Sequence, residues 1–413
     1  ISTSYGKRYQ FEDISSGSEY QNKVPISSSG DYTNGNESVY PLKAVLHTTG
    51  TIGHPKIINI TEEALERYQS YIYDLPKALL GIDEFISVHT GVFDITEQPS
   101  ILSTIYYDYL RKSGALDFNQ YVEKEDFLFS KDRFHIPYVK LRLALIEENL
   151  NAIESIYIYE IDVLLEYLYE NWKLLLNDIK RKECSIELSI SIRKKINLIA
   201  CESSRISYLE NIFERYKGKP PLDLIWPKMK YLSGIGQRNA YYVQRIKNNT
   251  LSIPIYYFAY ASSECMCGIA TKLDIDEYVL LPQSAFYEFI DEKQNRYLPT
   301  EVKIGEKYEL LITTFTGLYR YQTNDLLCIT GFEGESPRFK VLGRKNKILN
   351  IAGEKVDEWT IHEAMHSIIT LLQLEDVEYF IGIDTTRVPF GYALFTNISI
   401  SLFKEIEIQL DKR

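Results

Sequence analysis

Short apolar segments follow one another closely in the last third of the sequence. They cover residues 308–315, 326–330, 339–342 and 347–351. Residues 222–290 show a similar alternation of short apolar runs and turn residues. Such bounded runs are typical of β-strands. The second half of the chain is therefore predicted to be rich in sheet, with a helix following at residues 358–372.

The first half of the chain carries a helical pattern. Between residues 139 and 182, apolar side chains recur at helical spacing, which predicts two or more amphipathic helices. Nearer the start, residues 42–46 predict a strand, and Thr61 with the carboxylates after it predicts the N-cap and first turn of a helix. Residues 1–40 predict an irregular or short-helical lead-in whose aromatic side chains pack. The fold class predicted from these patterns is α/β.

Composition limits the partners and the location. The chain has 413 residues, of which 45% are hydrophobic, so its length favours about two or three structural units. A formal net charge of −11 argues against nucleic acid or an acidic membrane as a main partner. Apolar runs stop well short of the roughly 20 residues that cross a bilayer, so no membrane span is predicted. Five cysteines, sparse and odd in number, fit a reduced cytosol, which predicts a cytoplasmic protein. Because the sequence opens at Ile1 without a Met or a charged-then-apolar leader, we expect the natural start to lie upstream.

Residues 48–56 have the composition of a phosphate-binding loop. Small residues let the backbone approach phosphate oxygens, and the side chains of Thr48, Thr49 and Thr51 add hydroxyl donors. Lys56 adds a positive charge. The Gly-Lys-Ser/Thr ending of a P-loop is absent from this segment. We interpret the segment as a pyrophosphate clamp; an ordinary turn is the alternative.

A second polar segment follows a predicted strand at residues 255–258. Tyr260 is suited to stack on adenine, and Ser262 or Ser263 to donate to an α-phosphate. The Glu264 carboxylate is suited to hold Mg²⁺ through oxygen. The alternative is a polar strand end with Glu264 in solvent.

A third segment places Arg320 and Asp325 on either side of a turn. An acidic residue that accepts the two ribose hydroxyls is a common nucleotide contact, and Asp325 is the candidate. Asn324 suits the turn because Asn enters left-handed backbone conformations readily. Arg344 and Lys355 supply further positive charge downstream. The alternative is an exposed basic face.

In these three segments the chain resembles the adenylate-forming superfamily, and within it the acyl acid amido synthetases of the auxin-responsive Gretchen Hagen family and their bacterial relatives. The resemblance runs over most of the chain and is carried by residues 225–227, 260–264 and, most specifically, 308–332. It implies a large N-terminal adenylation domain of helices, mixed sheets and a distorted barrel over residues 1–345. A small hinged α+β domain, short for the family, is implied over residues 346–413.

The resemblance also implies an activity. Mg²⁺ and ATP would activate a small carboxylic acid as an acyl adenylate, and an amine, such as an amino acid, would then displace AMP to form an amide. Glu264 and Lys355 would be catalytic, and the acid pocket would draw on residues 88–93 and 231–240. The implied contacts are phosphate for Thr48, Thr49, Thr51 and Lys355, adenine for Tyr260, α-phosphate for Ser263, Mg²⁺ for Glu264 and ribose for Asp325. The residue types themselves add Lys56, Ser262 and Arg344 as further candidates for the nucleotide site.

The sequence departs from the family pattern at several positions. Ile52 stands where superfamily members often have a hydroxyl, Asn324 where Gly is usual, and Cys265 where Gly is common. The mobile lysine of the small domain has only positional candidates, Lys404 and Lys412. Two alternatives follow: a ligase that passes the acyl group to coenzyme A or a carrier protein, and a nucleotide-binding relative without catalysis.

Two metal-like patterns compete with this interpretation. Residues 362–366 match H-E-x-x-H, which on a helix would place His362 and His366 on one face for Zn²⁺ with Glu363 as general base. No third ligand stands out in the sequence. Cys265 and Cys267 lack a second Cys pair, so we interpret them as packed thiols.

Overall fold

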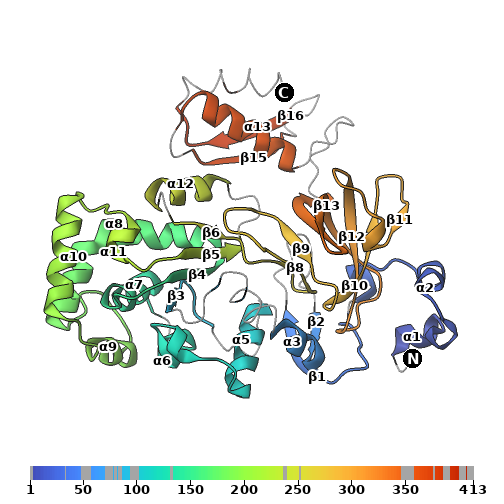
Figure 1. Ribbon diagram of the computed structural model, residues 1–413, viewed down its shortest axis with the longest axis horizontal. Helices are drawn as coiled ribbons and strands as arrows, with labels where there is room; N and C mark the ends of the chain where they lie inside the picture. The colour runs from blue at the N-terminus through green and yellow to red at the C-terminus, as the bar shows by residue number, and fades with distance from the viewer. Residues whose placement is uncertain are drawn as a thin grey trace.

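The protein is a mixed α/β structure (Figure 1). The computed structural model describes residues 3–32, 34–47, 57–69, 78, 81, 86–93, 102–130, 134–235, 240–250, 253–345, 358–374, 377–384, 391–399 and 406. The helices α7 to α11 lie at one end of the molecule in Figure 1, and the strands β10 to β13 lie at the other. The predicted α/β class is confirmed, with both parallel and antiparallel sheets.

The lead-in is short-helical, as predicted. It consists of α1 (Ser4–Arg8), η1 (Phe11–Asp13), α2 (Gly17–Lys23) and η2 (Ser29–Tyr32). Its aromatic side chains pack: the Tyr5 ring stacks on Tyr319, with centroids 4.9 Å apart. Strand β1 (Leu42–His47) then pairs antiparallel with β2 (Ile57–Thr61). The Thr61 hydroxyl accepts from the Ala64 N–H at 3.4 Å and so caps α3 (Glu62–Gln69), which confirms that prediction.

A parallel sheet of four strands forms the centre of the helical end. Its order is β3-β4-β5-β6, with β3 at Ser87–His89, β4 at Ala152–Tyr157, β5 at Tyr231–Ile235 and β6 at Ile255–Tyr256. The surrounding helices are α5 (Leu102–Ser113), α6 (Lys124–Leu128), α7 (Ile136–Ile146), α8 (Ile158–Arg181), α9 (Ile190–Asn197), α10 (Ser203–Arg215), α11 (Leu222–Ile225) and α12 (Ala240–Thr250), with the 3₁₀ turn η4 (Phe118–Gln120). The helical pattern of residues 139–182 is confirmed as α7 and α8. It missed β4 between them, because a strand of six residues is too short for periodicity to separate it from the helices beside it.

The other end is an antiparallel sheet of eight strands in the order β11-β10-β12-β13-β14-β9-β8-β7. Its strands are β7 (Ala259–Ala261), β8 (Met266–Ile269), β9 (Tyr278–Leu280), β10 (Ala285–Ile290), β11 (Arg296–Tyr297), β12 (Lys307–Thr314), β13 (Tyr321–Glu333) and β14 (Ser336–Arg344), with the turn η5 (Pro299–Glu301). The predicted strands at 308–315, 326–330 and 339–342 are confirmed in β12, β13 and β14. The fourth, at 347–351, lies outside the described residues. The sheet prediction for 222–290 is wrong at α11 and α12.

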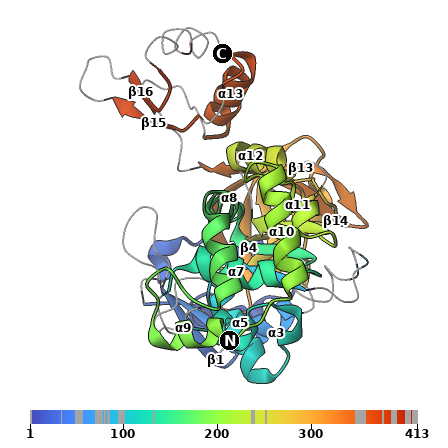
Figure 2. The ribbon, with the colours of Figure 1, turned by 90° about the vertical axis from the view of Figure 1, so that its left-hand side faces the viewer.

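The C-terminal elements form a separate group. They are α13 (Glu358–Leu371), which confirms the predicted helix, and an antiparallel pair of β15 (Tyr379–Asp384) and β16 (Gly391–Thr396). Their own small apolar core contains Met365, Ile368 and Ile406. Figure 2 shows this group set apart from the rest of the chain. The domain boundary at residue 346 lies outside the described residues and stays a prediction.

None of the helices in the described ranges has an apolar stretch long enough to cross a bilayer.

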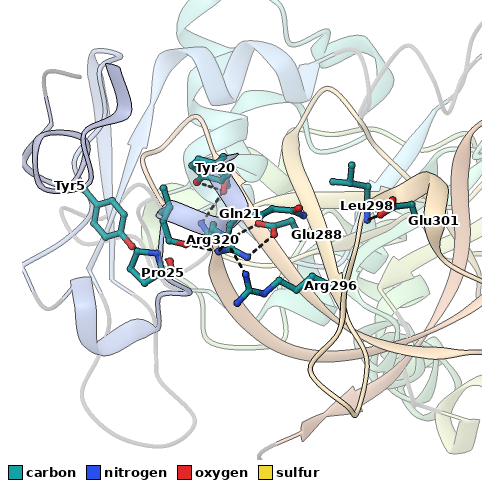
Figure 3. A network of polar contacts seen from close by, with 11 residues as sticks. Tyr5, Tyr20, Gln21, Pro25, Glu288, Arg296, Leu298, Glu301 and Arg320 are labelled. Atoms are coloured by element: carbon teal, nitrogen blue, oxygen red, sulfur yellow. Dashed lines mark hydrogen bonds and ion pairs between the residues drawn. The ribbon is translucent and has the colours of Figure 1, made fainter. Parts of the chain in front are cut away.

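Arg320 fastens the lead-in to the large sheet (Figure 3). Its Nε and one terminal nitrogen donate to the two carboxylate oxygens of Glu288, each at 2.8 Å. The other terminal nitrogen donates to the Gln21 carbonyl at 2.6 Å. Arg320 is 1% exposed and adopts φ 47°, a left-handed conformation held by these contacts. These contacts fix the position of the residue that directly precedes β13.

Candidate active site

Tyr260, Asp325 and Arg344 meet at one point, although they come from β7, β13 and β14. The Tyr260 hydroxyl donates to Asp325 Oδ2 at 2.5 Å, and Arg344 Nε donates to Asp325 Oδ1 at 3.0 Å. Asp325 and Arg344 are register partners on neighbouring antiparallel strands, which explains their contact. The structure thus brings together three residues that the sequence analysis selected from separate segments.

The contact of Tyr260 with Asp325 reveals how strongly the large sheet curls. In the strand order, β7 and β13 are separated by β8, β9 and β14. In a flat sheet this separation is about 19 Å, from four spacings of about 4.8 Å. A hydrogen bond across it requires the sheet to bend back on itself. The predicted distorted barrel stays a prediction, which this curvature supports.

The adenine-stacking role expected of Tyr260 stays a prediction. Only 4% of its surface is exposed, and its ring packs edge-on against Phe339 with centroids 5.6 Å apart. Gly268 makes room for the Phe339 ring, since a Cβ on Gly268 would lie 2.9 Å from it. The role of Tyr260 in this structure is to hold Asp325 through the hydroxyl.

Burial is the main cause of the pKa shifts of Asp325 and Tyr260. Burial raises the pKa of Asp325, and the neighbouring Arg344 opposes that rise. Burial, reinforced by the Asp325 charge, raises the pKa of Tyr260 well above its ordinary value. Tyr260 therefore keeps its proton and acts as a donor, while Asp325 accepts from both sides.

Glu264 lies beside this group on the turn after β7. Its Oε1 accepts from the Tyr321 hydroxyl at 3.1 Å, and the residue is 9% exposed. Burial and the Glu264 charge raise the pKa of Tyr321, so Tyr321 donates as a neutral phenol. A carboxylate oxygen held by a neutral donor matches the oxygen ligation that Mg²⁺ prefers. The donor set therefore fits a magnesium ligand at Glu264.

Ser262 shapes the turn that presents Glu264. Its hydroxyl oxygen accepts from the backbone N–H groups of Glu264 at 3.2 Å and Cys265 at 3.4 Å. The Ser262 N–H donates back to the Cys265 carbonyl at 2.9 Å. Ser263 lies at the corner of the same turn and is partly exposed. The phosphate contacts expected of both serines stay predictions, and Ser262 would have to exchange a turn contact to make one.

The other expected phosphate ligands, Thr48, Thr49, Thr51, Lys56 and Lys355, lie outside the described residues. The structure does place the two ends of the first loop: His47 and Ile57 are register partners in β1 and β2. Residues 48–56 therefore connect two antiparallel strands.

Sequence reasoning missed Tyr321 and the ion pair of Lys345 with Glu309. Lys345 Nζ lies 3.1 Å from Glu309 Oε2, and Glu309 is 2% exposed. Tyr321 belongs to the same polar segment as Asp325, but the register of β13 shifts between Gln322 and Leu326, so regular alternation could not predict a shared face. Asn324, predicted to be left-handed, has φ 63°.

The expected acid-pocket segment 88–93 begins within β3 and continues beyond its end at His89. His89 is buried beside Phe93, with ring centroids 4.7 Å apart, and Phe93 stacks on Tyr107 at 3.9 Å. Burial and the Lys140 charge lower the pKa of His89 to about 3, so His89 is neutral. Phe93 shares an apolar cluster with Ala259 of β7, which joins this segment to the Asp325 group. Part of the second expected segment, 236–239, lies outside the described residues.

The structure describes the metal-like patterns in part. Residues 362–366 are helical in α13, and His366 is exposed, but the side chains of His362 and Glu363 lie outside the described residues. Within the part of the chain that the structure describes, no three His, Cys, Asp or Glu side chains are placed to hold a metal. Cys265 and Cys267 are buried free thiols, packed as expected.

Comparison with known proteins identifies the family. Residues 2–255 match the GH3 family N-terminal domain, and residues 278–344 match the GH3 family central domain. Indole-3-acetic acid-amido synthetase GH3.2 of Arabidopsis thaliana is 24% identical over 95% of this chain and 80% of its own. Probable indole-3-acetic acid-amido synthetase GH3.11 of Oryza sativa subsp. japonica is 26% identical over 86% of this chain and 67% of its own.

Solved structures share the fold. The GH3.15 acyl acid amido synthetase superposes with a TM-score of 0.82 at 21% identity, over 99% of this chain and 79% of its own. A 2-hydroxyisobutyryl-CoA ligase in the postadenylation state superposes with a TM-score of 0.57 at 13% identity, over 99% of this chain and 79% of its own. The relation to bacterial members stays a prediction. The domain matches cover most of the sequence, including the strands that carry Asp325 and Arg344, and they show that this chain belongs to the GH3 family of acyl acid amido synthetases, within the adenylate-forming superfamily.

Proposed function

We propose that this chain activates a small carboxylic acid with Mg²⁺ and ATP and joins it to the amine of an amino acid. The carboxylate oxygen attacks the α-phosphorus and pyrophosphate leaves, giving an acyl adenylate. The amine nitrogen then attacks the acyl carbon, AMP leaves with its electron pair, and the nitrogen loses a proton. The observation that carries the proposal is the meeting of Asp325, Arg344 and Glu264, drawn from distant segments, in a chain of this family.

Each residue of the group has a chemical task in this proposal. Asp325, oriented by Tyr260 and Arg344, binds the ribose hydroxyls. Glu264 is the magnesium ligand, and the bound ion would offset charge on the phosphates. The proposed phosphate ligands remain Thr48, Thr49, Thr51, Lys56, Ser262, Ser263 and Lys355.

The names of the relatives suggest where to look for the acid. Two relatives are named for indole-3-acetic acid, and one solved GH3.15 structure is a complex with 2,4-DB. We propose that the substrate is a small carboxylic acid of this kind, and these two compounds open the panel of candidate acids. The expected location is cytoplasmic, with no nucleic-acid or membrane partner.

The fold likeness to a coenzyme A ligase keeps one enzymatic alternative open. Incubating the protein with ATP, Mg²⁺ and the acid panel, with either mixed amino acids or coenzyme A, separates the two by mass spectrometry. Acyl-amino acid amides, formed in excess over thioesters, are the expected products. Thioesters without amides would replace the proposed second half-reaction.

The ribose role of Asp325 predicts a loss of nucleotide affinity. Asp325→Ala removes charged hydrogen bonds worth about 1.5–3 kcal/mol, so ATP should bind roughly 10- to 100-fold more weakly by calorimetry. Tyr260→Phe is the matched control, since it removes only the hydroxyl that holds Asp325. It should weaken binding by roughly fivefold, from about 1 kcal/mol. Unchanged affinity in Asp325→Ala would remove the ribose assignment.

A further inference from the structure

A buried arginine among the helices next to the parallel sheet lacks a directly bonded acid. Arg142 on α7 is 0% exposed. One terminal nitrogen donates to the Tyr138 hydroxyl at 3.0 Å, the Glu183 carbonyl at 2.6 Å and Cys184 Sγ at 3.1 Å, and lies 3.4 Å from Asn197 Oδ1. Its Nε and its other terminal nitrogen are buried without a hydrogen-bond partner among the described residues. The four acceptors around this guanidinium are a phenol, a backbone carbonyl, a thiol and an amide oxygen, all of them neutral groups.

Asp178 is near but does not neutralise Arg142 directly. Its Oδ2 accepts from the Tyr138 hydroxyl at 2.6 Å and from the Ser185 N–H at 2.7 Å. Burial and the bond to Asp178 raise the pKa of Tyr138, so a neutral phenol stands between the two charges. A buried cation without a bonded anion is costly, and an anion formed beside it would be stabilised.

Cys184 is the neighbour of Arg142 that can become such an anion. It lies on the loop between α8 and α9 and is partly exposed, between the exposed residues Glu183 and Ser185. As a thiol it donates to Asn197 Oδ1 at 3.1 Å. As a thiolate it would accept from Arg142, and rotation of the Asn197 amide would add a second donor.

We propose that Cys184 is an oxidation site for hydroperoxides, separate from the adenylation chemistry. The thiolate sulfur attacks one peroxide oxygen, so an S–O bond forms and the O–O bond breaks. Sulfur loses two electrons and becomes a sulfenic acid, while the leaving hydroxide, or the alkoxide of an organic hydroperoxide, takes a proton to become water or an alcohol. A small thiol restores the residue by forming and then exchanging a mixed disulfide.

Two other partly exposed cysteines serve as internal comparators. Cys201 Sγ lies 3.7 Å from the Glu202 carbonyl oxygen, and Cys328 Sγ lies 3.9 Å from the Gly305 carbonyl oxygen. A carbonyl oxygen accepts from a thiol and disfavours its thiolate. Burial raises the pKa of Cys201 despite the nearby Arg205. In the part of the chain that the structure describes, neither sulfur accepts a hydrogen bond from a guanidinium, as Cys184 does from Arg142.

The first test uses the wild-type protein. It is treated with hydrogen peroxide in the presence of dimedone, which traps sulfenic acids, and the labelling rate of each cysteine is followed by peptide mass spectrometry. Cys184 should be labelled roughly tenfold faster than Cys201 and Cys328, because the thiolate is the reactive form. Labelling of Cys184 at or below the rate of the comparators would overturn the proposal.

A variant separates the charge effect from simple exposure. Asn197→Asp places a carboxylate beside Cys184 and also gives Arg142 an anionic partner, so the fold should keep its melting temperature. Labelling of Cys184 should fall roughly tenfold, because the carboxylate opposes the thiolate and occupies the guanidinium. Cys184→Ser must abolish the labelled peptide. An unchanged rate in folded Asn197→Asp would contradict the role of Arg142.

Discussion

Replacing Glu264 by Gln should lower acid-dependent adenylate formation by about 10²–10³-fold. The amide keeps the shape of the side chain and can still accept from Tyr321, but it loses the charge that binds Mg²⁺. The measurement is pyrophosphate exchange into ATP across a magnesium titration. The half-saturating magnesium concentration should rise as the rate falls, because the change removes a metal ligand.

Tyr321→Phe is the control for this prediction. It removes the hydroxyl that orients Glu264 and leaves the carboxylate in place. We expect a loss of less than tenfold, from about 1 kcal/mol for one hydrogen bond. If Glu264→Gln retained activity within threefold of wild type, Glu264 would not be the magnesium ligand.

Replacing Arg320 by Met should destabilise the protein by about 3–5 kcal/mol, because it leaves a buried carboxylate unpaired. Glu288 is 1% exposed and bonds both of its oxygens to Arg320. Urea denaturation should show a lower midpoint for the variant.

Arg296 offers a matched control for Arg320, because it donates to the same Gln21 carbonyl at 2.8 Å from an exposed position (Figure 3). Arg296→Met should cost less than about 1 kcal/mol. The double variant Arg320→Met with Glu288→Leu should recover part of the stability, since no charge then stays buried alone. A loss of stability in Arg320→Met no larger than that in Arg296→Met would show that the ion pair of Arg320 with Glu288 contributes little to the free energy of unfolding.

Much of the fold could be predicted from local patterns. The strands β12, β13 and β14 were visible as bounded apolar runs, and α7, α8 and α13 as helical spacing. Thr61 was recognised as a cap because its acidic neighbours favour a helix N-terminus. These features depend on side chains close in sequence.

The features that were missed depend on long-range contacts. Strand β4 has only six residues, buried at Ala152 and Ile153 and more exposed toward Tyr157, so it carries no alternation that separates it from the helices around it. The large sheet curls and so brings the Tyr260 hydroxyl to Asp325. This curvature has no signature in the local sequence. Residue types alone suggested stacking for Tyr260, whereas its hydrogen bond to Asp325 depends on a contact between residues 65 apart in sequence.

The candidate site was predicted in the same uneven way. Asp325, Arg344 and Glu264 were selected by residue type and segment, and the first two proved to be in direct contact. Tyr321 escaped attention because its phenol bonds across to another segment. The ion pair of Lys345 with Glu309 could not be read from residues that lie 36 apart in sequence.

The most direct test of the central claim is pyrophosphate exchange into ATP, with Mg²⁺ and pooled carboxylic acids that include indole-3-acetic acid and 2,4-DB. It detects adenylation without requiring the amine. Exchange that depends on both an acid and Mg²⁺, and that is lost in Glu264→Gln, is the predicted result. Failure of the wild-type protein to bind ATP, together with no exchange for any pool, would contradict the account.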